Sequence, residues 1–360
     1  MTDKQQRLFI FAGSYAEPEE NGVHVYAFDE NTGELTLTDQ FAGLKNPTFL
    51  NVDDRNLKLY AISEGANSEG KKIGQAAAFA IDPAAGTLRF LSRADTVAAP
   101  TCHIQRDSDS RFLIVASYHG GMAGLVTLMD DGRIGKLLDT EQYEGHGANP
   151  ERQDRPHPHS SFFSPDGKYL FIQDLGLDRI NTYTIDAAAG KLSPHGSIST
   201  HPGAGPRHLV FRPDGLFSYV INEIDSTVTA FAYDADSGQL TSLETVSTLP
   251  EGFDGENTCA EITVSRDGKF LYGSNRGHDS IVIYSIDPAS GKLTLVDHVS
   301  VQGAHPRHFA LTPAGNYLIA ANRDTNNIVT FRVHKNTGML EYTGKSITVS
   351  KPVCVQPLYL

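Results

Sequence analysis

A strand-like segment recurs seven times along this chain of 360 residues. Each copy is a short, mostly apolar run, and six of the seven copies end in an aspartate. The copies lie 47 to 56 residues apart, and they end at Asp29, Asp82, Asp130, Asp186, Asp234, Asp287 and His334. A period of about 50 residues indicates a repeat architecture, in which each unit is one small sheet or hairpin packed against its neighbours.

The residues around this segment predict four short strands in each unit. In six of the seven copies a glycine follows the final residue by four positions, a spacing that favours a β-turn capped by the aspartate, with positive φ at the glycine. A segment rich in aromatic and β-branched residues precedes each copy, and another, often introduced by proline, comes before that. Such period-two runs between turn residues are typical of strands.

Seven units of four strands predict an all-β fold, a seven-bladed β-propeller that forms a single domain over residues 1–360. The chain starts with the second strand of a blade, and residues 351–355 resemble the missing first strand. We therefore expect the C-terminal strand to close the N-terminal blade, which removes the free edge of an open ring. A series of β-sandwiches would not explain seven matched copies.

Composition limits the partners and the compartment. The formal net charge of −13 argues against a protein that binds nucleic acid or an anionic membrane with its whole surface. Three scattered cysteines, Cys102, Cys259 and Cys354, do not form a disulfide framework or a CxxC metal site. The chain has no stretch of membrane-spanning length and no signal-peptide pattern at its N-terminus. We expect a cytoplasmic protein.

Charged residues gather at positions that are equivalent between repeats. One set near the start of the first strands comprises Thr48, Cys102, His159, Arg207, Ala260 and Arg307. The next positions are Phe49, His103, Ser160, His208, Glu261 and His308. The ends of the second strands are Tyr15, Glu64, Tyr118, Leu175, Glu223, Arg276 and Arg323. These sets hold four arginines, which we expect to converge at one mouth of the channel and to suit an anionic small molecule.

Other interpretations remain open for these residues. An arginine near a glutamate at a blade end also fits an inter-blade ion pair with no functional role. Fourteen histidines invite a metal site, but no HExxH motif or Cys/His cluster is present, so we expect no metal. The polar segment 141–155 fits either a cover over the channel mouth or a mobile surface loop.

Four segments resemble the seven-bladed lactonase family, which includes bacterial 6-phosphogluconolactonases and fungal carboxymuconate-cyclising enzymes. They are HPHSSFFSPDGKYLF (157–171), GPRHLVFRPDG (205–215) followed by YVINE (219–223), AEITVSRDGKFLYGSNRG (260–277) and HPRHFALTPAGNYLIAANR (305–323). The resemblance covers essentially the whole chain. It implies a catalytic set made of a histidine, two arginines and a glutamate, which fall on His159, Arg207, Glu223 and Arg276.

The resemblance implies a lactone hydrolase, with 6-phosphogluconolactone of the pentose phosphate pathway as the expected substrate. Opening the lactone needs a base, which we expect to be Glu223 or His159, and groups that stabilise the oxyanion, which we expect to be Arg207 and Arg276. No cofactor is required. The residues expected to bind the phosphate and hydroxyl groups are His103, Tyr118, His157, His208, Arg307, His308 and Arg323. Two alternatives are a cycloisomerase acting on a carboxymuconate-type dicarboxylate and a non-catalytic ligand-binding propeller.

Overall fold

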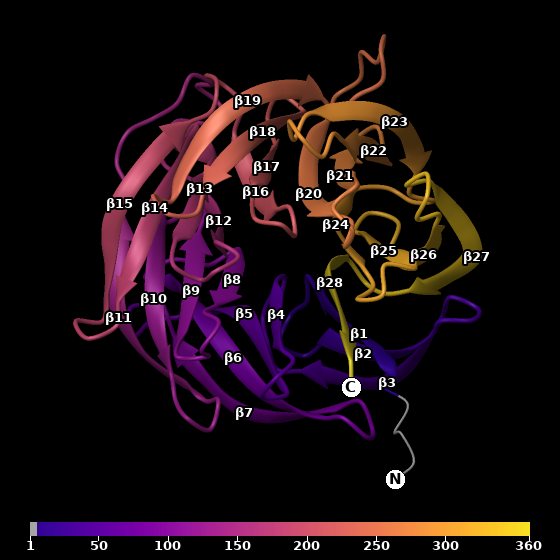
Figure 1. Cartoon of the computed structure of the whole chain (residues 1–360). Helices are drawn as coiled ribbons and strands as arrows, with labels where there is room; N and C mark the ends of the chain where they lie inside the picture. The colour runs from indigo at the N-terminus through magenta and orange to yellow at the C-terminus, as the bar shows by residue number, and fades with distance from the viewer. Residues whose placement is uncertain (1–5) are drawn as a thin grey trace.

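The computed structural model describes residues 6–360, which form seven four-stranded antiparallel sheets arranged in a ring around a central channel (Figure 1). The predicted seven-bladed propeller is confirmed. The first five residues of the expected domain lie outside the described part of the chain. In six of the sheets the strand that lines the channel pairs with the next strand along the chain, and in every sheet the outermost strand lies at the rim.

The first three complete sheets in chain order follow the predicted repeat. The second blade contains β4 (Leu50–Asp53), β5 (Lys58–Ala66), β6 (Lys72–Asp82) and β7 (Thr87–Asp95). The third contains β8 (His103–Arg106), β9 (Phe112–Ser117), β10 (Met122–Leu128) and β11 (Ile134–Gln142). The fourth contains β12 (Pro158–Phe163), β13 (Leu170–Asp174), a 3-10 turn η1 (Leu175–Leu177), β14 (Arg179–Asp186) and β15 (Lys191–Ser199).

The next three blades repeat the same order. The fifth contains β16 (Pro206–Phe211), β17 (Phe217–Asn222), β18 (Thr227–Asp234) and β19 (Gln239–Ser247). The sixth contains β20 (Thr258–Val264), β21 (Phe270–Arg276), β22 (Ser280–Ile286) and β23 (Leu293–Ser300). The seventh contains β24 (Pro306–Leu311), β25 (Tyr317–Asn322), β26 (Asn327–Val333) and β27 (Leu340–Thr348).

The first blade joins the two ends of the chain, as predicted. Its strands are β1 (Leu8–Ser14), β2 (Asn21–Asp29), β3 (Glu34–Ala42) and, on the channel side, β28 (Pro352–Tyr359). β28 runs antiparallel to β1, with Leu8 opposite Tyr359 and Gly13 opposite Cys354. Because Cys354 and Val355 are fully buried, this last strand closes both the sheet and the hydrophobic core of the ring.

The repeated glycine does more than complete a turn. Gly33, Gly86, Gly190, Gly238, Gly291 and Gly338 all have positive φ, as expected. At Gly86, Gly238 and Gly291 an added Cβ would also clash with an aromatic ring of the preceding blade. Glycine is therefore needed at these positions for two reasons, the backbone conformation of the turn and the close contact between neighbouring blades.

Alanine at Gly291 is expected to destabilise the fold more than alanine at Gly315, although both glycines have a φ of +70°. The positive φ costs about 1 kcal/mol in either variant. At Gly291 the new Cβ also meets the ring of Phe217, which adds roughly 1–3 kcal/mol of overpacking, whereas at Gly315 the nearest atom is 4.0 Å away. Urea unfolding of the two variants measures the difference, and equal losses would contradict the inter-blade role.

Candidate active site

A repeated backbone irregularity places side chains at one mouth of the channel. The register between the first and second strands shifts between Pro158 and Ser160, between Pro206 and His208, and between Pro306 and His308. The extra residues at these bulges are His159, Arg207 and Arg307. A β-bulge redirects side chains that regular alternation would place on opposite faces, and bulges are common beside active sites.

Glu223 is the centre of the charged cluster at this mouth. It follows β17 directly, beside the bulge that carries Arg207. Its Oε2 accepts from Nε of Arg207 at 2.9 Å and lies 2.9 Å from Nη2 of Arg276. Its Oε1 accepts from Nη2 of Arg152 at 2.5 Å. We call Glu223 and these three arginines the arginine cluster. Three of the four predicted catalytic residues thus contact one another.

The arginine cluster contains an inter-blade ion pair and also an excess of positive charge. The pair between Glu223 and Arg276 joins the fifth and sixth blades, as the structural interpretation anticipated. One carboxylate faces three guanidinium groups, however, so the cluster carries positive charge beyond what pairing needs. An excess of buried positive charge is costly unless an anion compensates it.

The arginines keep Glu223 ionised. Burial alone would raise the pKa of Glu223, but the guanidinium groups of Arg276, Arg207 and Arg152 hold it far below its usual range. Burial, with Arg307 and Arg276 nearby, lowers the pKa of Arg207 to about 9, which still leaves it charged at neutral pH. Both oxygens of Glu223 are occupied by guanidinium groups, so its role in this arrangement is to hold the arginines in place.

His159 has the properties of a neutral base. Its side chain is only 4% exposed, and its ring lies 5.3 Å from the ring of His208. Burial, together with the charge of Arg207, holds the pKa of His159 well below its usual range. Its Nδ1 is buried and makes no hydrogen bond within residues 6–360. An uncharged imidazole next to arginines is unprotonated at neutral pH and so is free to take a proton from water.

His208, the residue that follows Arg207, is more deeply buried than His159 and supports Arg207. Nη1 of Arg207 donates to Nε2 of His208 at 3.2 Å, and Nδ1 of His208 is 3.1 Å from both oxygens of Glu261. Nε2 of His308 reaches Glu261 at 3.0 Å, and Nδ1 of His308 accepts from the backbone of Val355 in β28. Burial lowers the pKa of His208 to about 4, so this histidine is neutral and Glu261 supplies the charge.

The remaining predicted binding residues fall into two groups. Tyr118 stacks on His157 with 4.1 Å between ring centroids, and His157 reaches the backbone oxygen of Tyr118, so this pair borders the mouth. His103 instead packs against Phe49 and Phe162 inside the channel. The structure therefore does not bring His103 or His308 into contact with Glu223; both line a cavity of about 490 Å³ towards the other mouth.

The other two predicted arginines differ from each other. Arg323 is paired with its neighbour Asp324, at 2.6 Å between Nε and Oδ1. Arg307 is half-buried and makes no hydrogen bond or ion pair within residues 6–360. Its charge is close enough to lower the pKa values of both Arg207 and Arg276. Arg307 is therefore a cation at the mouth without a protein counter-charge.

Arg152 and Glu261 were not among the predicted site residues. Glu261 occupies one of the repeat-equivalent positions, where its charge was the available signal. Arg152 lies on the connection between the third and fourth blades, which has no counterpart in the repeat, and the polar composition of the segment 141–155 was its only signal. Of the segment 141–155, Glu141 belongs to β11, whereas Arg152 reaches over the mouth to Glu223, as the cover interpretation anticipated.

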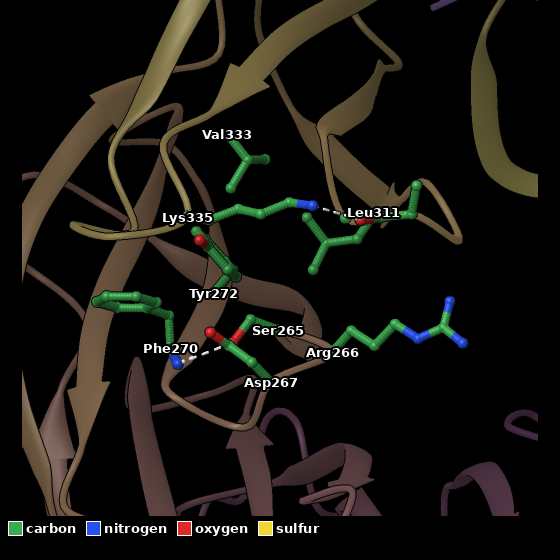
Figure 2. A pocket seen from close by; sticks show the side chains of 10 residues that line it. Ser265, Arg266, Asp267, Phe270, Tyr272, Leu311, Val333 and Lys335 are labelled. Carbon is green, nitrogen blue, oxygen red and sulfur yellow. Dashed lines mark hydrogen bonds between the residues drawn. The ribbon is translucent and has the colours of Figure 1, made fainter.

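One cavity away from this mouth lacks this chemistry. Figure 2 shows a cavity of about 240 Å³ between the sixth and seventh blades. Its polar groups are satisfied locally: Nζ of Lys335 donates to the backbone of Ala314, and Oγ of Ser265 accepts from the backbone of Phe270. Within residues 6–360 no group of three or more His, Cys, Asp or Glu side chains is arranged to hold a metal ion. That same part of the chain contains no helix long and apolar enough to cross a membrane.

Comparison with known proteins agrees with the repeat and the site. The family model described as "Lactonase, 7-bladed beta-propeller" matches residues 9–357. The chain belongs to this lactonase family. It is 34% identical to a 6-phosphogluconolactonase of Bacillus subtilis (strain 168), covering 97% of this chain and 98% of that protein. It is 36% identical to a 6-phosphogluconolactonase of Formosa agariphila, covering 95% and 97%.

A solved structure extends the similarity to three dimensions. The periplasmic gluconolactonase of Pseudomonas aeruginosa superposes with a TM-score of 0.91 at 32% identity, covering 98% of this chain and 99% of that one. The lactonase family and its similarly built relatives identify the protein as a lactone hydrolase. A lactonase needs a base, oxyanion donors and a site for its substrate, and the mouth at Glu223 offers all three types of group.

Proposed function

We propose that this lactonase hydrolyses 6-phospho-D-glucono-1,5-lactone to 6-phosphogluconate, a step of the pentose phosphate pathway. The supporting observation is the charge at the mouth. Arg152, Arg207, Arg276 and Arg307 oppose two carboxylates, Glu223 and Glu261, so these six side chains together carry a net charge of +2. A phosphate monoester carries a charge of about −1.5 to −2 at pH 7, which complements this excess.

His159 is the proposed base. It takes a proton from a water molecule as that water attacks the lactone carbonyl carbon. Arg207 and Arg276, held by Glu223, stabilise the negative charge that develops on the carbonyl oxygen. When the bond to the ring oxygen breaks, His159 returns the proton to that oxygen. The sum is one lactone and one water converted to one hydroxy acid, and the proposed mechanism requires no cofactor.

Substrate preference is tested by direct hydrolysis assays. Freshly generated 6-phosphogluconolactone and glucono-δ-lactone are supplied in parallel, the spontaneous opening of each is subtracted, and both assays are repeated with EDTA. We expect a larger kcat/KM for the phosphorylated lactone, and we expect the rate to survive EDTA. A preference for the unphosphorylated lactone would contradict the proposed substrate, and turnover of a carboxymuconate without lactone hydrolysis would contradict the proposed reaction.

The rate is expected to persist below the usual titration range of histidine. The base is active when neutral, and the pKa of His159 is held well below 6.5 by burial and by Arg207. Lowering the pH through 6.5 therefore leaves the base unprotonated, and the rate falls only when the pH passes the lowered pKa. We expect kcat/KM for glucono-δ-lactone to change by less than about twofold between pH 7.5 and 5.5. A fall by half near pH 6.5 would contradict this role.

We place the protein in the cytoplasm, where its substrate would be made. Cys102, Cys259 and Cys354 form no disulfide, which is compatible with a reducing compartment. The similar protein of Pseudomonas aeruginosa is named as periplasmic, so localisation of this protein by cell fractionation tests the cytoplasmic proposal.

A further inference from the structure

Arg152 differs from the other arginines of the cluster in its exposure. The side chains of Arg207 and Arg276 are 2% and 6% exposed, whereas that of Arg152 is 38% exposed. Arg207 and Arg276 both contact Oε2 of Glu223 and also donate to backbone oxygens of the sixth blade. Arg152 contacts the opposite oxygen, Oε1, from the solvent side. It is therefore the member of the cluster that a ligand entering the mouth meets first.

The backbone that carries Arg152 is anchored. The side chain of Gln153 is fully buried, and its Nε2 donates to the backbone of Leu175 at 2.9 Å and to Asp178 at 2.6 Å. Its Oε1 accepts from the backbone of Asn149, while Oδ1 of Asn149 accepts from the backbone of Arg152. The turn 149–153 is thus fixed to the fourth blade next to the mouth.

Three features suit Arg152 for binding an anion. The backbone that carries it is anchored, its side chain is partly open to solvent, and it shares Glu223 with two other cations. The carboxylate therefore stays compensated if Arg152 turns to a ligand. Unpaired Arg307 at the same mouth adds a second cation for the same anion. A guanidinium group can hold two phosphate oxygens at once, a geometry that an ammonium group does not reproduce.

We propose that Arg152 binds the phosphate group of the substrate and so determines the preference for a phosphorylated lactone. This inference rests on the proposed function. It assigns a specificity-determining role to a residue outside the repeat and outside the predicted catalytic set. Arg207 and Arg276 then act at the lactone carbonyl, while Arg152 acts at the far end of the substrate.

The test compares two substrates on three variants. Arg152→Gln removes the charge, Arg152→Lys keeps the charge but loses the planar fork, and Arg155→Gln removes a charge from the same segment. Arg155 is the matched control because it is exposed, pairs with Asp154 and does not contact Glu223. We expect Arg152→Gln to lower kcat/KM for 6-phosphogluconolactone by roughly 10- to 100-fold, mainly through KM, and that for glucono-δ-lactone by less than about threefold.

The remaining outcomes separate the inference from the proposed function. Arg152→Lys is expected to fall between the wild type and Arg152→Gln, and Arg155→Gln is expected to match the wild type. Equal losses on both lactones in Arg152→Gln would overturn the inference, because Arg152 would then act by holding Glu223. Calorimetric titration with 6-phosphogluconate measures binding without turnover. Weaker binding in the Arg152 variants, but not in Arg155→Gln, supports phosphate binding by Arg152. This result does not depend on which lactone the wild type hydrolyses faster. Unchanged binding in Arg152→Gln overturns the inference.

Discussion

Replacement of His159 by asparagine is expected to lower kcat by a factor of roughly 10² to 10⁴, with little change in KM. His159 is the buried, neutral imidazole beside Arg207, and the proposed mechanism uses it twice, first to take the proton of water and then to return it to the ring oxygen. Asparagine fits the space but does not accept a proton. Steady-state kinetics on the phosphorylated lactone measure the loss.

A second buried histidine provides the control. His24 in β2 is 9% exposed, its pKa is also lowered by burial, and its Nδ1 has no partner within the described residues. It contacts none of the arginines of the cluster. His24→Asn should therefore leave kcat within about twofold of the wild type, while any cost of replacing a buried histidine appears as lower stability in both variants. A His159→Asn enzyme with wild-type kcat would show that another group is the base.

Glu223→Gln is expected to lower kcat by roughly 10² to 10³. Glutamine keeps the shape of the side chain but removes the charge that holds Arg152, Arg207 and Arg276. Without it, the three guanidinium groups repel one another, and Arg207 and Arg276 move from the positions in which they stabilise the oxyanion. Loss of one partner from a buried ion pair also costs about 3–5 kcal/mol of stability, so folding of the variant is checked by circular dichroism and thermal unfolding.

The control for Glu223→Gln is a glutamate at the equivalent position of another repeat. Glu64 is the equivalent residue in the second blade, where it accepts from Asn46 at 2.8 Å and contacts no arginine. Glu64→Gln removes the same charge from the equivalent position of another blade. We expect it to keep most of the activity, so that the difference between the two variants isolates the arginine cluster. A folded and fully active Glu223→Gln or Glu223→Ala protein would rule out the role given to Glu223.

The repeat made most of this structure predictable from sequence. Seven copies of one pattern indicated seven blades, and the incomplete first copy indicated that residues near Val355 complete the ring. Charged residues at repeat-equivalent positions also led to Arg207, Glu223 and Arg276, because equivalent positions in a ring converge on its axis. Positions of a repeat that serve only the fold are filled by similar residues, so a charged residue at such a position indicates a functional role.

The repeat could not predict how deeply the histidines are buried, and it could not identify Arg152 as the third arginine of the cluster. Regular alternation places neighbouring side chains on opposite faces of a strand, but the bulge at Arg207 lets both Arg207 and His208 face the cluster. A sequence pattern does not show where such a bulge occurs. Arg152 lies on a connection that has no counterpart in other blades, and its position depends on the burial of Gln153, a long-range contact with the fourth blade.

The measurement that tests the central claim most directly is a crystal structure of the protein with 6-phosphogluconate bound. The claim predicts the product at the mouth formed by the arginine cluster, with its carboxylate near Arg207 and His159 and its phosphate near Arg152 and Arg307. Product bound instead in the cavity at the opposite mouth, among Phe162, Phe309 and His103, would contradict the claim and would move the reaction to the other end of the channel.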